Sequence, residues 1–375
     1  MSGSICDVLP AAAALLGAAD TSARRSPLGL RERIGEVRRV AVVLVDGMGA
    51  HLLPHLAADA PLLASVLAGE LGWLNELTCA FPSTTPTSLV SLSTGVLAGE
   101  HGILGFTVKM PGSDRVLNHL TWRDDPPPAR WQPVSTWFER LARAGICTRV
   151  LLPAAFLGSG LTQAAYRGAH FCATAIDRDY GQRLADELAA APGLVYGYTA
   201  ELDTAAHLFG IGSPQWHTAA AHVDELLTRL VEGLPPDAAL LVTADHGGLN
   251  APAEARVDIG VDPRLAAGVR VIAGDPRVRY LHTEPGATAD VLATWSELLA
   301  GRAEVRSRDD AVVHGWFGPV RAEHRPRIGD VVVLCTGDTT VLASGHEPPE
   351  VARLVGIHGS ASPAEMAIPL IVVGG

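Results

Sequence analysis

Cysteine, lysine and long apolar runs are scarce in this 375-residue sequence. Its five cysteines are widely spread and form no C-x-x-C pair, which argues against a disulfide scaffold or a cysteine-based zinc finger. No apolar run reaches the roughly 18 residues that a membrane-spanning helix needs. Lys109 is the single lysine, and no arginine-rich block stands in for the missing lysines. These absences leave a globular protein without a membrane span as the broad class.

Charged residues make up only 18% of the chain, whereas apolar residues make up 48%, enough to bury a large core and to exclude disorder as the main state. The formal net charge of −11 repels nucleic acid and anionic lipid, so a nucleic-acid-binding module is excluded. Residues 11–19 resemble a short signal core but lack a preceding basic segment, and we interpret them as a helix of a soluble protein. With the spread cysteines, this predicts a cytoplasmic location.

Short apolar runs that alternate with helical stretches give the predicted architecture. Continuous β-branched runs favour strands buried on both faces, hence an α/β fold with a mostly parallel central sheet and helices on both faces. The predicted strands are 40–45, 148–152, 194–198, 238–243, 331–335 and 368–373, and the predicted helices include 135–144 and 213–232. Residues 255–327 differ in pattern and predict a small inserted α+β subdomain, which leaves 1–254 and 328–375 as the core.

Aspartate and histidine residues gather at the ends of these predicted strands. Asp46 follows the first strand and Asp245-His246 follows another, while Asp203, His207 and His358 lie close to two more. Ligands of open parallel sheets bind at the carboxyl ends of the strands, so these side chains are expected to meet. Each also has an ordinary explanation when taken alone: a turn, a helix-surface pair or a buried loop histidine.

Together these residues indicate metal binding. The i,i+4 spacing places the Asp203 carboxylate and the His207 imidazole on one helical face, as the ligands of a single ion require. Mixed imidazole and carboxylate ligands suit zinc or manganese better than magnesium or calcium. Six such ligands are too many for one tetrahedral zinc, and two metal ions fit better.

A second feature is the segment Phe81-Pro82-Ser83-Thr84-Thr85-Pro86. Pro86 suits the first position of a helix, which predicts Thr85 as the N-cap. A hydroxyl at that place faces the positive end of the helix dipole, which favours a phosphoryl group or an alkoxide. Plain capping explains the same residue without chemistry, and a hydroxyl nucleophile also needs activation, which a metal can supply.

The order of these motifs resembles the type I phosphodiesterase/nucleotide pyrophosphatase family of the alkaline phosphatase superfamily. The matching motifs are Asp46 after its strand, FPSTTPTS with the following TG and HG pairs, Asp203-x-x-x-His207, Asp245-His246-Gly247 and Gly356-Ile357-His358-Gly359. The similarity covers about residues 40–375 except the inserted region. It implies an alkaline-phosphatase-like fold.

The resemblance also implies roles for individual residues. One metal would be held by Asp46, Thr85, Asp245 and His246 and the other by Asp203, His207 and His358, with Thr85 as nucleophile. The nucleotide-hydrolysing members of the family usually place an asparagine just after the HG-apolar-apolar-Gly stretch. Here Phe106 takes that place, and Asn118 is a candidate replacement at a different spacing.

We therefore predict a two-metal-dependent phosphoric ester hydrolase, a phosphodiesterase or nucleotide pyrophosphatase that forms a covalent phosphothreonine. Two zinc ions are the expected cofactors, with manganese as an alternative, and the expected partner is a small phosphate ester, for which a nucleotide is one candidate. Two alternatives remain: a phosphomonoesterase or phosphonate hydrolase of the same superfamily, and a non-catalytic metal-binding domain.

Overall fold

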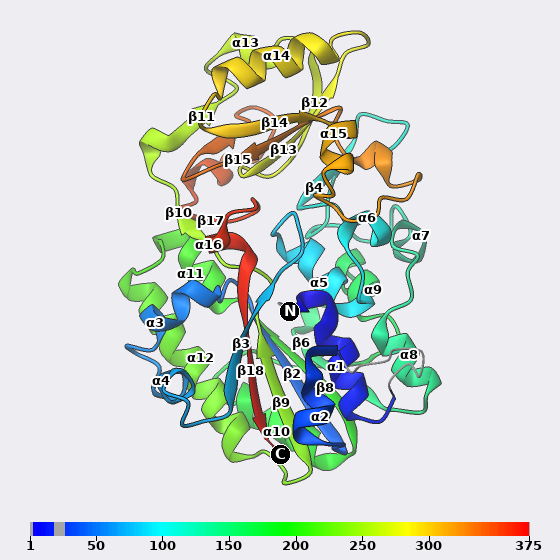
Figure 1. Cartoon of the computed structure of the whole chain (residues 1–375), viewed down its shortest axis with the longest axis vertical. Helices are drawn as coiled ribbons and strands as arrows, with labels where there is room; N and C mark the ends of the chain where they lie inside the picture. The colour runs from blue at the N-terminus through cyan, green and yellow to red at the C-terminus, as the bar shows by residue number, and fades with distance from the viewer. Residues whose placement is uncertain (1–2, 19–26, 375) are drawn as a thin grey trace.

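A central eight-stranded sheet organises the computed structural model, which describes residues 3–18 and 27–374. The strand order is β1-β3-β18-β9-β2-β8-β6-β7 (Figure 1). In that order the strands are Gly3–Ser4, Trp73–Thr78, Ala367–Gly374, Ala238–Thr243, Arg39–Val45, Gly193–Thr199, Thr148–Leu152 and His170–Ala173. Among these described strands, β18 alone runs antiparallel to its neighbours, so the sheet is mostly parallel, as predicted.

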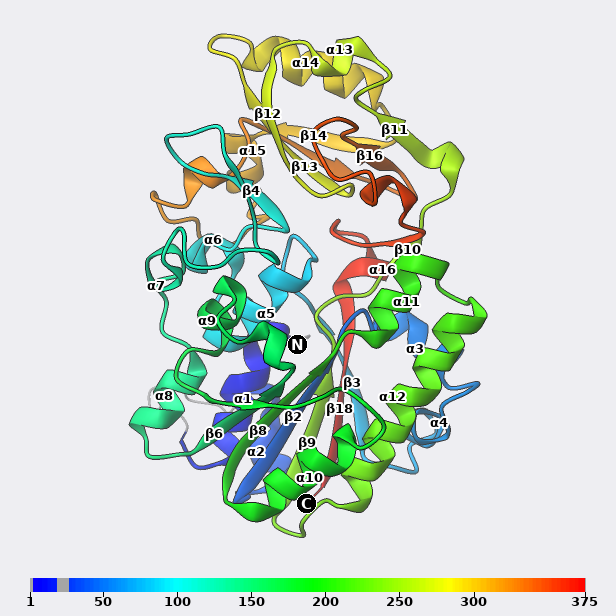
Figure 2. The same ribbon diagram turned by 180° about the vertical axis from the view of Figure 1, so that it is seen from behind.

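Helices cover both faces of this sheet, which confirms the α/β prediction (Figures 1 and 2). On one face lie α1 (Val8–Leu15), α2 (Leu30–Ile34), α5 (Thr85–Thr94), α8 (Trp137–Arg143) and α9 (Gly160–Tyr166). On the other lie α3 (Leu53–Leu56), α4 (Pro61–Leu67), α10 (Tyr180–Ala190), α11 (Glu201–Phe209) and α12 (Pro214–Glu232). The central strand β2 is buried almost throughout, because helices shield both of its faces.

Local signals in the sequence place several of these helices. The predicted helix 213–232 is confirmed as α12, whose N-cap Ser213 accepts a hydrogen bond from the Trp216 N–H at 3.2 Å. The predicted helix 135–144 is α8, which starts after a Thr136 capping box. The helix expected at 11–19 begins earlier, as α1, and ends at Leu15. Ala19 lies outside the described residues.

A second, four-stranded antiparallel sheet lies beyond one end of the central sheet, above it in Figures 1 and 2. Its order is β12-β13-β15-β14, with bounds Val269–Gly274, Val278–Thr283, Val331–Cys335 and Ala303–Ser307. Helix α14 (Thr288–Leu298) packs on its outer side, and α13 (Pro263–Ala266) and α15 (Arg308–Val313) flank it. The sheet and these helices form an α+β arrangement.

The predicted placement of residues 331–335 in the central sheet is wrong, because this strand pairs with β13 and β14 instead. Its apolar run does reflect burial on both faces. Val332 and Leu334 pack into the main core, whereas Val331 and Val333 pack with Trp295 of α14. An apolar run indicates that both faces of a strand are covered, but it does not indicate which layers cover them. Because β15 belongs to the second sheet, that sheet extends past residue 327.

Shorter elements complete the described chain. The two-stranded pairs are β4 (Thr107–Lys109) with β5 (Val116–Asn118), β10 (Leu249–Asn250) with β17 (Gly356–Ile357), and β11 (Arg256–Asp258) with β16 (Thr340–Leu342). The short helices are α6 (Ala98–His101), α7 (Pro128–Trp131) and α16 (Pro363–Met366). Across residues 3–18 and 27–374, no helix has the length and apolarity to cross a membrane.

Candidate functional site

The candidate site lies at the carboxyl ends of three adjacent strands of the central sheet. Strand β2 runs directly into Asp46, and its neighbour β9 ends just before Asp245 and His246. On the other side of β2, β8 leads into α11, which carries Asp203 and His207. Parallel neighbours end at the same edge, so residues far apart in the sequence meet there.

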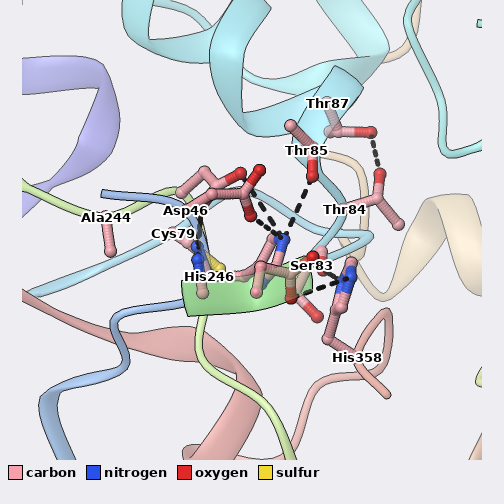
Figure 3. A network of polar contacts seen from close by, with 12 residues as sticks. Asp46, Cys79, Ser83, Thr84, Thr85, Thr87, Ala244, His246 and His358 are labelled. Carbon is pink, nitrogen blue, oxygen red and sulfur yellow. Dashed lines mark hydrogen bonds and ion pairs between the residues drawn. The ribbon is translucent and has the colours of Figure 1, made fainter. Parts of the chain in front are cut away.

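The first group of side chains surrounds the Nε2 atom of His246. This atom lies 3.2 Å from Thr85 Oγ1, 3.3 Å from Asp46 Oδ1 and 3.5 Å from Asp245 Oδ2. Figure 3 shows Asp46 and Thr85 pointing toward the His246 ring. The structure therefore brings together all four residues that the resemblance implies for one metal.

Thr85 is not the N-cap of α5, contrary to the prediction. Thr84 has the extended N-cap conformation, and Thr85 is the first helical residue. The Ser88 N–H donates to the Thr84 carbonyl oxygen at 3.0 Å, so the first helical hydrogen bond begins one residue earlier than expected. The shift turns the Thr85 hydroxyl toward His246.

Two carboxylate oxygens in this group are buried without a hydrogen-bond partner, Asp46 Oδ1 and Asp245 Oδ2. Burial is the largest cause that raises the pKa of Asp46 well above its usual range. The nearby carboxylates of Asp245 and Asp203 raise it further. Burial, and then Asp203, raises the pKa of Asp245 to about 6. Burial lowers the pKa of His246, so this imidazole is neutral and gives the carboxylates no compensating charge. The group is short of positive charge.

The second group consists of Asp203, His207 and His358. His207 Nε2 lies 3.0 Å from Asp203 Oδ2 and 3.3 Å from His358 Nε2. Burial lowers the pKa of His207, but the adjacent Asp203 carboxylate raises it more, to about 9. Burial and the neighbouring His246 lower the pKa of His358 to about 3. Ligand atoms of Asp46, Asp203 and His246 also lie within 4.8 Å of one another, which places Asp203 between the two groups.

All three histidines present the same nitrogen to the site. Nδ1 of His207 lies 2.7 Å from the Gly356 carbonyl oxygen, that of His246 2.9 Å from Gly247 O, and that of His358 2.8 Å from Ser83 O. A carbonyl oxygen only accepts, so Nδ1 carries a proton in each ring and Nε2 is the nitrogen left to bind a metal. This is the arrangement of metal-ligating histidines. In His207, whose pKa is raised to about 9, Nε2 would give up its proton when a metal binds. With the unpartnered carboxylate oxygens, the residues fit two divalent cations.

Three further polar residues near the site have structural roles. His101 Nε2 lies 2.8 Å from Ser91 Oγ, and buried His119 bonds to the Gly105 carbonyl oxygen at 2.7 Å. Asn118 Oδ1 accepts the Leu120 N–H at 2.9 Å, which stabilises a turn. Asn118 does not line the cavity described next, so nothing supports it as a substitute for the missing asparagine.

A cavity of about 610 Å³ opens over the two groups. Asp46, Thr85, Asp203, His207 and His358 lie along it, and its other walls are mainly apolar, including Leu89, Phe106, Leu120, Trp122 and Phe156. Among its described lining residues, Arg123 is the one arginine or lysine. A neighbouring cavity of about 760 Å³ shares Phe156 and Tyr198 with it but contains no candidate ligand.

The sequence did not single out Tyr198, Ser83 or Arg123. The Tyr198 hydroxyl donates to Asp46 Oδ2, which leaves Oδ1 free to face the site. Tyr198 lies at the end of a buried strand, the same signal that identified Asp46, so it could have been found. Ser83 acts through its backbone oxygen and Arg123 lies on an irregular loop, and neither has a signal in the sequence.

Comparisons with known proteins concern the family and the fold. The model of the family described as type I phosphodiesterase/nucleotide pyrophosphatase matches residues 40–361. Murine ectonucleotide pyrophosphatase/phosphodiesterase 5, an inactive variant with a threonine replaced by alanine, in complex with AMP, has a TM-score of 0.71 at 18% identity, over 90% of this chain and 88% of that one. The human protein of the same name has a TM-score of 0.69 at 17% identity, over 90% and 88%. A search of the curated proteins found no match. At these identities the structural likeness shows a shared fold.

Proposed function

The chain belongs to the type I phosphodiesterase/nucleotide pyrophosphatase family and is an enzyme of that class, and we propose that it hydrolyses phosphoric esters with two divalent cations and Thr85 as nucleophile. The observation that carries the proposal is the convergence of three histidine Nε2 atoms, each on a ring fixed through Nδ1, and two unpartnered carboxylate oxygens beside one buried hydroxyl. Asp46, Thr85, Asp245 and His246 would hold one cation. Asp203, His207 and His358 would hold the other.

The cations, when bound, would neutralise phosphoryl oxygens and lower the pKa of a hydroxyl. Thr85 Oγ1 attacks phosphorus in line while the bond to the leaving group breaks, which forms a phosphothreonine. Water then attacks the same phosphorus, and the Thr85 oxygen leaves as the product phosphate is released. The N-terminal end of α5, where Thr85 lies, favours the negative charge that develops there.

The proposed substrate is a small phosphate ester, and a nucleotide is a candidate. The murine structure with AMP supports this, since it concerns a protein of the same fold. Apolar walls that include Phe106 and Trp122 leave room for more than a phosphoryl group, and Arg123 offers a charged donor for an anion. Zinc is the proposed metal because imidazole and carboxylate ligands suit it, with manganese as the alternative. The five unpaired cysteines support a cytoplasmic location.

Two alternatives differ in their expected chemistry. A phosphomonoesterase or phosphonate hydrolase would use the same ligands on a different substrate. A non-catalytic metal-binding domain would tolerate a damaged ligand set, whereas all seven candidate side chains are present.

One experiment separates these possibilities. Chelated protein is assayed on bis(p-nitrophenyl) phosphate, p-nitrophenyl phosphate and a p-nitrophenyl phosphonate ester, without metal and with zinc or manganese. We expect hydrolysis of the diester, restored by metal. A preference for the monoester or the phosphonate supports the first alternative, and no turnover with two bound metals supports the second. Full activity in metal-free protein would contradict the two-metal proposal.

A further inference from the structure

A buried ion pair joins the second sheet to the loops that carry two candidate ligands. Arg277 lies in the turn between β12 and β13, and Glu365 lies in α16, just before β18. Both side chains are fully buried, at 0% exposure each. Two hydrogen bonds connect them, from Nε to Oε1 at 2.9 Å and from Nη2 to Oε2 at 2.8 Å. This two-pronged contact fixes the orientation of both groups.

Glu365 contacts the loops of both His246 and His358. Its Oε1 accepts the Ser360 N–H at 2.9 Å, two residues after His358. Its backbone oxygen accepts the Gly247 N–H at 2.8 Å, directly after His246. Its Oε2 also accepts the hydroxyl of Ser362. Each carboxylate oxygen therefore accepts two hydrogen bonds, and the loss of one acceptor leaves a buried donor unpaired.

The second sheet also packs directly against the His358 loop. Ser360 Oγ donates to the carbonyl oxygen of Cys335 in β15 at 2.6 Å. Gly359 has a φ of +136°, and a Cβ at this position would lie 2.4 Å from Asp275 Oδ1 in the turn that holds Arg277. The backbone beside His358 is thus held between Glu365, β15 and the β12–β13 turn.

We propose that Arg277 and Glu365 are positioning residues for the metal centre, so that metal affinity depends on this link to the second sheet. The proposal rests on the proposed function, because it takes His246 and His358 to be metal ligands. A buried ion pair is a poor source of stability, since desolvation offsets the attraction. Groups that orient metal ligands from outside, in contrast, commonly change metal affinity by 10- to 100-fold. In this proposal Glu365 orients His246 and His358 through hydrogen bonds to the backbone of their loops.

Glu365→Gln tests this link with little change in shape. A glutamine side chain has one acceptor oxygen in place of two. If that oxygen keeps the bonds from Arg277 Nε and Ser360, the amide NH2 takes the place of Oε2 and faces the donor Arg277 Nη2, so the two-pronged contact is lost. We expect the variant to bind zinc about 10- to 100-fold more weakly than the parent. The measurement is competition with a chromogenic chelator, on protein shown to be folded by circular dichroism.

The pair Arg279–Glu347 supplies a matched control that joins β13 of the same sheet to a different loop. Arg279 Nη2 donates to both Glu347 carboxylate oxygens, at 2.9 and 2.7 Å, and both side chains are largely buried, at 3% and 16% exposure. Glu347 Oε1 accepts the N–H of Ala343, which lies in neither ligand loop. We expect Glu347→Gln to lower resistance to urea while its zinc dissociation constant stays within about twofold of the parent value.

Zinc affinity of folded Glu365→Gln within about twofold of the parent would overturn the proposal, and so would an equal loss in Glu347→Gln, which indicates general destabilisation. If Glu365→Gln does not fold, Arg277→Lys gives the same comparison, because lysine keeps the charge but not the two-pronged contact. If the parent protein binds no zinc, both the proposed function and this inference are contradicted. If the parent protein binds two zinc ions and the variants bind zinc with the same affinity, only the inference is contradicted.

Discussion

Thr84 and Thr85 are adjacent hydroxyl residues with different surroundings. Thr84 is the N-cap of α5, and its Oγ1 lies 3.0 Å from Thr87 Oγ1. The Thr85 hydroxyl instead lies 3.2 Å from His246 Nε2. Figure 3 marks this contact with a dashed line. A role in helix formation and a role in chemistry can therefore be tested at neighbouring positions.

Thr85→Ala should lower kcat by roughly 10³-fold or more, because the covalent route disappears. Its free energy of unfolding should change by less than about 1 kcal/mol, since Thr85 is not the cap. Two metals per chain should remain, and Thr85→Ser should keep part of the activity. Steady-state kinetics and elemental analysis give these values.

Thr84→Ala is the control, because it removes the same atoms one residue earlier. We expect this variant to lose about 1 kcal/mol of stability, because the buried hydrogen bond to Thr87 disappears, and to retain most of its turnover. A Thr85→Ala enzyme that hydrolyses its best diester near the parent rate would rule out the proposed nucleophile.

His358 lies far in sequence from Asp203 and His207, yet its Nε2 lies 3.3 Å from that of His207. His358→Ala should lower the metal content by about one ion per chain and cut turnover steeply, since a ligand is lost. His222→Ala serves as control, because His222 is half-buried, pairs with Glu201 and belongs to neither group of candidate ligands. Two ions per chain in the His358 variant would remove this residue from the ligand set.

Arg123 lines the cavity and makes no hydrogen bond or ion pair with any described residue. The nearby carboxylate of Asp125 pairs with Arg115 instead, with Nη1 and Oδ2 2.8 Å apart. Arg123→Ala should raise KM for an anionic diester about tenfold, as expected for one lost charge-assisted hydrogen bond. Arg178→Ala removes an equal charge beside the neighbouring cavity and should change KM less than about twofold. Equal effects in both variants would indicate long-range charge rather than contact.

At the scale of elements, α11 carries two candidate ligands, and α12 supports α11. Helix α11 places Asp203 and His207 one turn apart, with the carboxylate and imidazole 3.0 Å from each other. Helix α12 packs against α11 and contributes no candidate ligand. Damage to the support can therefore be distinguished from damage to the ligands.

Ser213→Ala removes the N-cap of α12, whose hydroxyl accepts the Trp216 N–H. We expect a loss of about 1 kcal/mol in the free energy of unfolding, measured by urea denaturation. Metal content and kcat/KM should stay at parent values, because α12 contributes no candidate ligand. A large drop in kcat/KM at full metal content would show that α12 controls the site geometry.

On the scale of the whole molecule, the chain carries a net charge of −11, and the site buries several of its carboxylates. Burial raises the pKa of Asp245 to about 6, above the usual value for aspartate of 3.8. The stabilising contribution of such a group is complete below its usual pKa and is lost as pH rises through about 6. The contribution of Asp245 to the stability of metal-free protein should therefore be lost in this interval.

Zinc should restore that stability, because it neutralises the carboxylates and binds deprotonated ligands. We expect the rise in Tm on adding zinc to chelated protein to be larger at about pH 7.5 than at about pH 5, measured by differential scanning fluorimetry. An equal rise at both values would contradict the assignment of the buried carboxylates as ligands.

The sequence by itself determined the parts of the protein that depend on local pattern. Apolar runs buried on both faces identified β2, β8 and β9, and the residues that follow them gave Asp46, Asp245 and His246. These inferences were possible because the strand and the residue after it are adjacent in the chain, and parallel strands end at a common edge.

Only the tertiary structure decided which layer covers each strand and which atoms meet. The apolar run of β15 was clear, but its pairing with β13 and its packing under α14 depend on residues far away in the sequence. The same holds for the carbonyl oxygen of Ser83 that fixes His358, and for the link from Arg277 to Glu365. Periodicity reports burial, whereas the partner of a buried group is chosen by long-range packing, which no local pattern records.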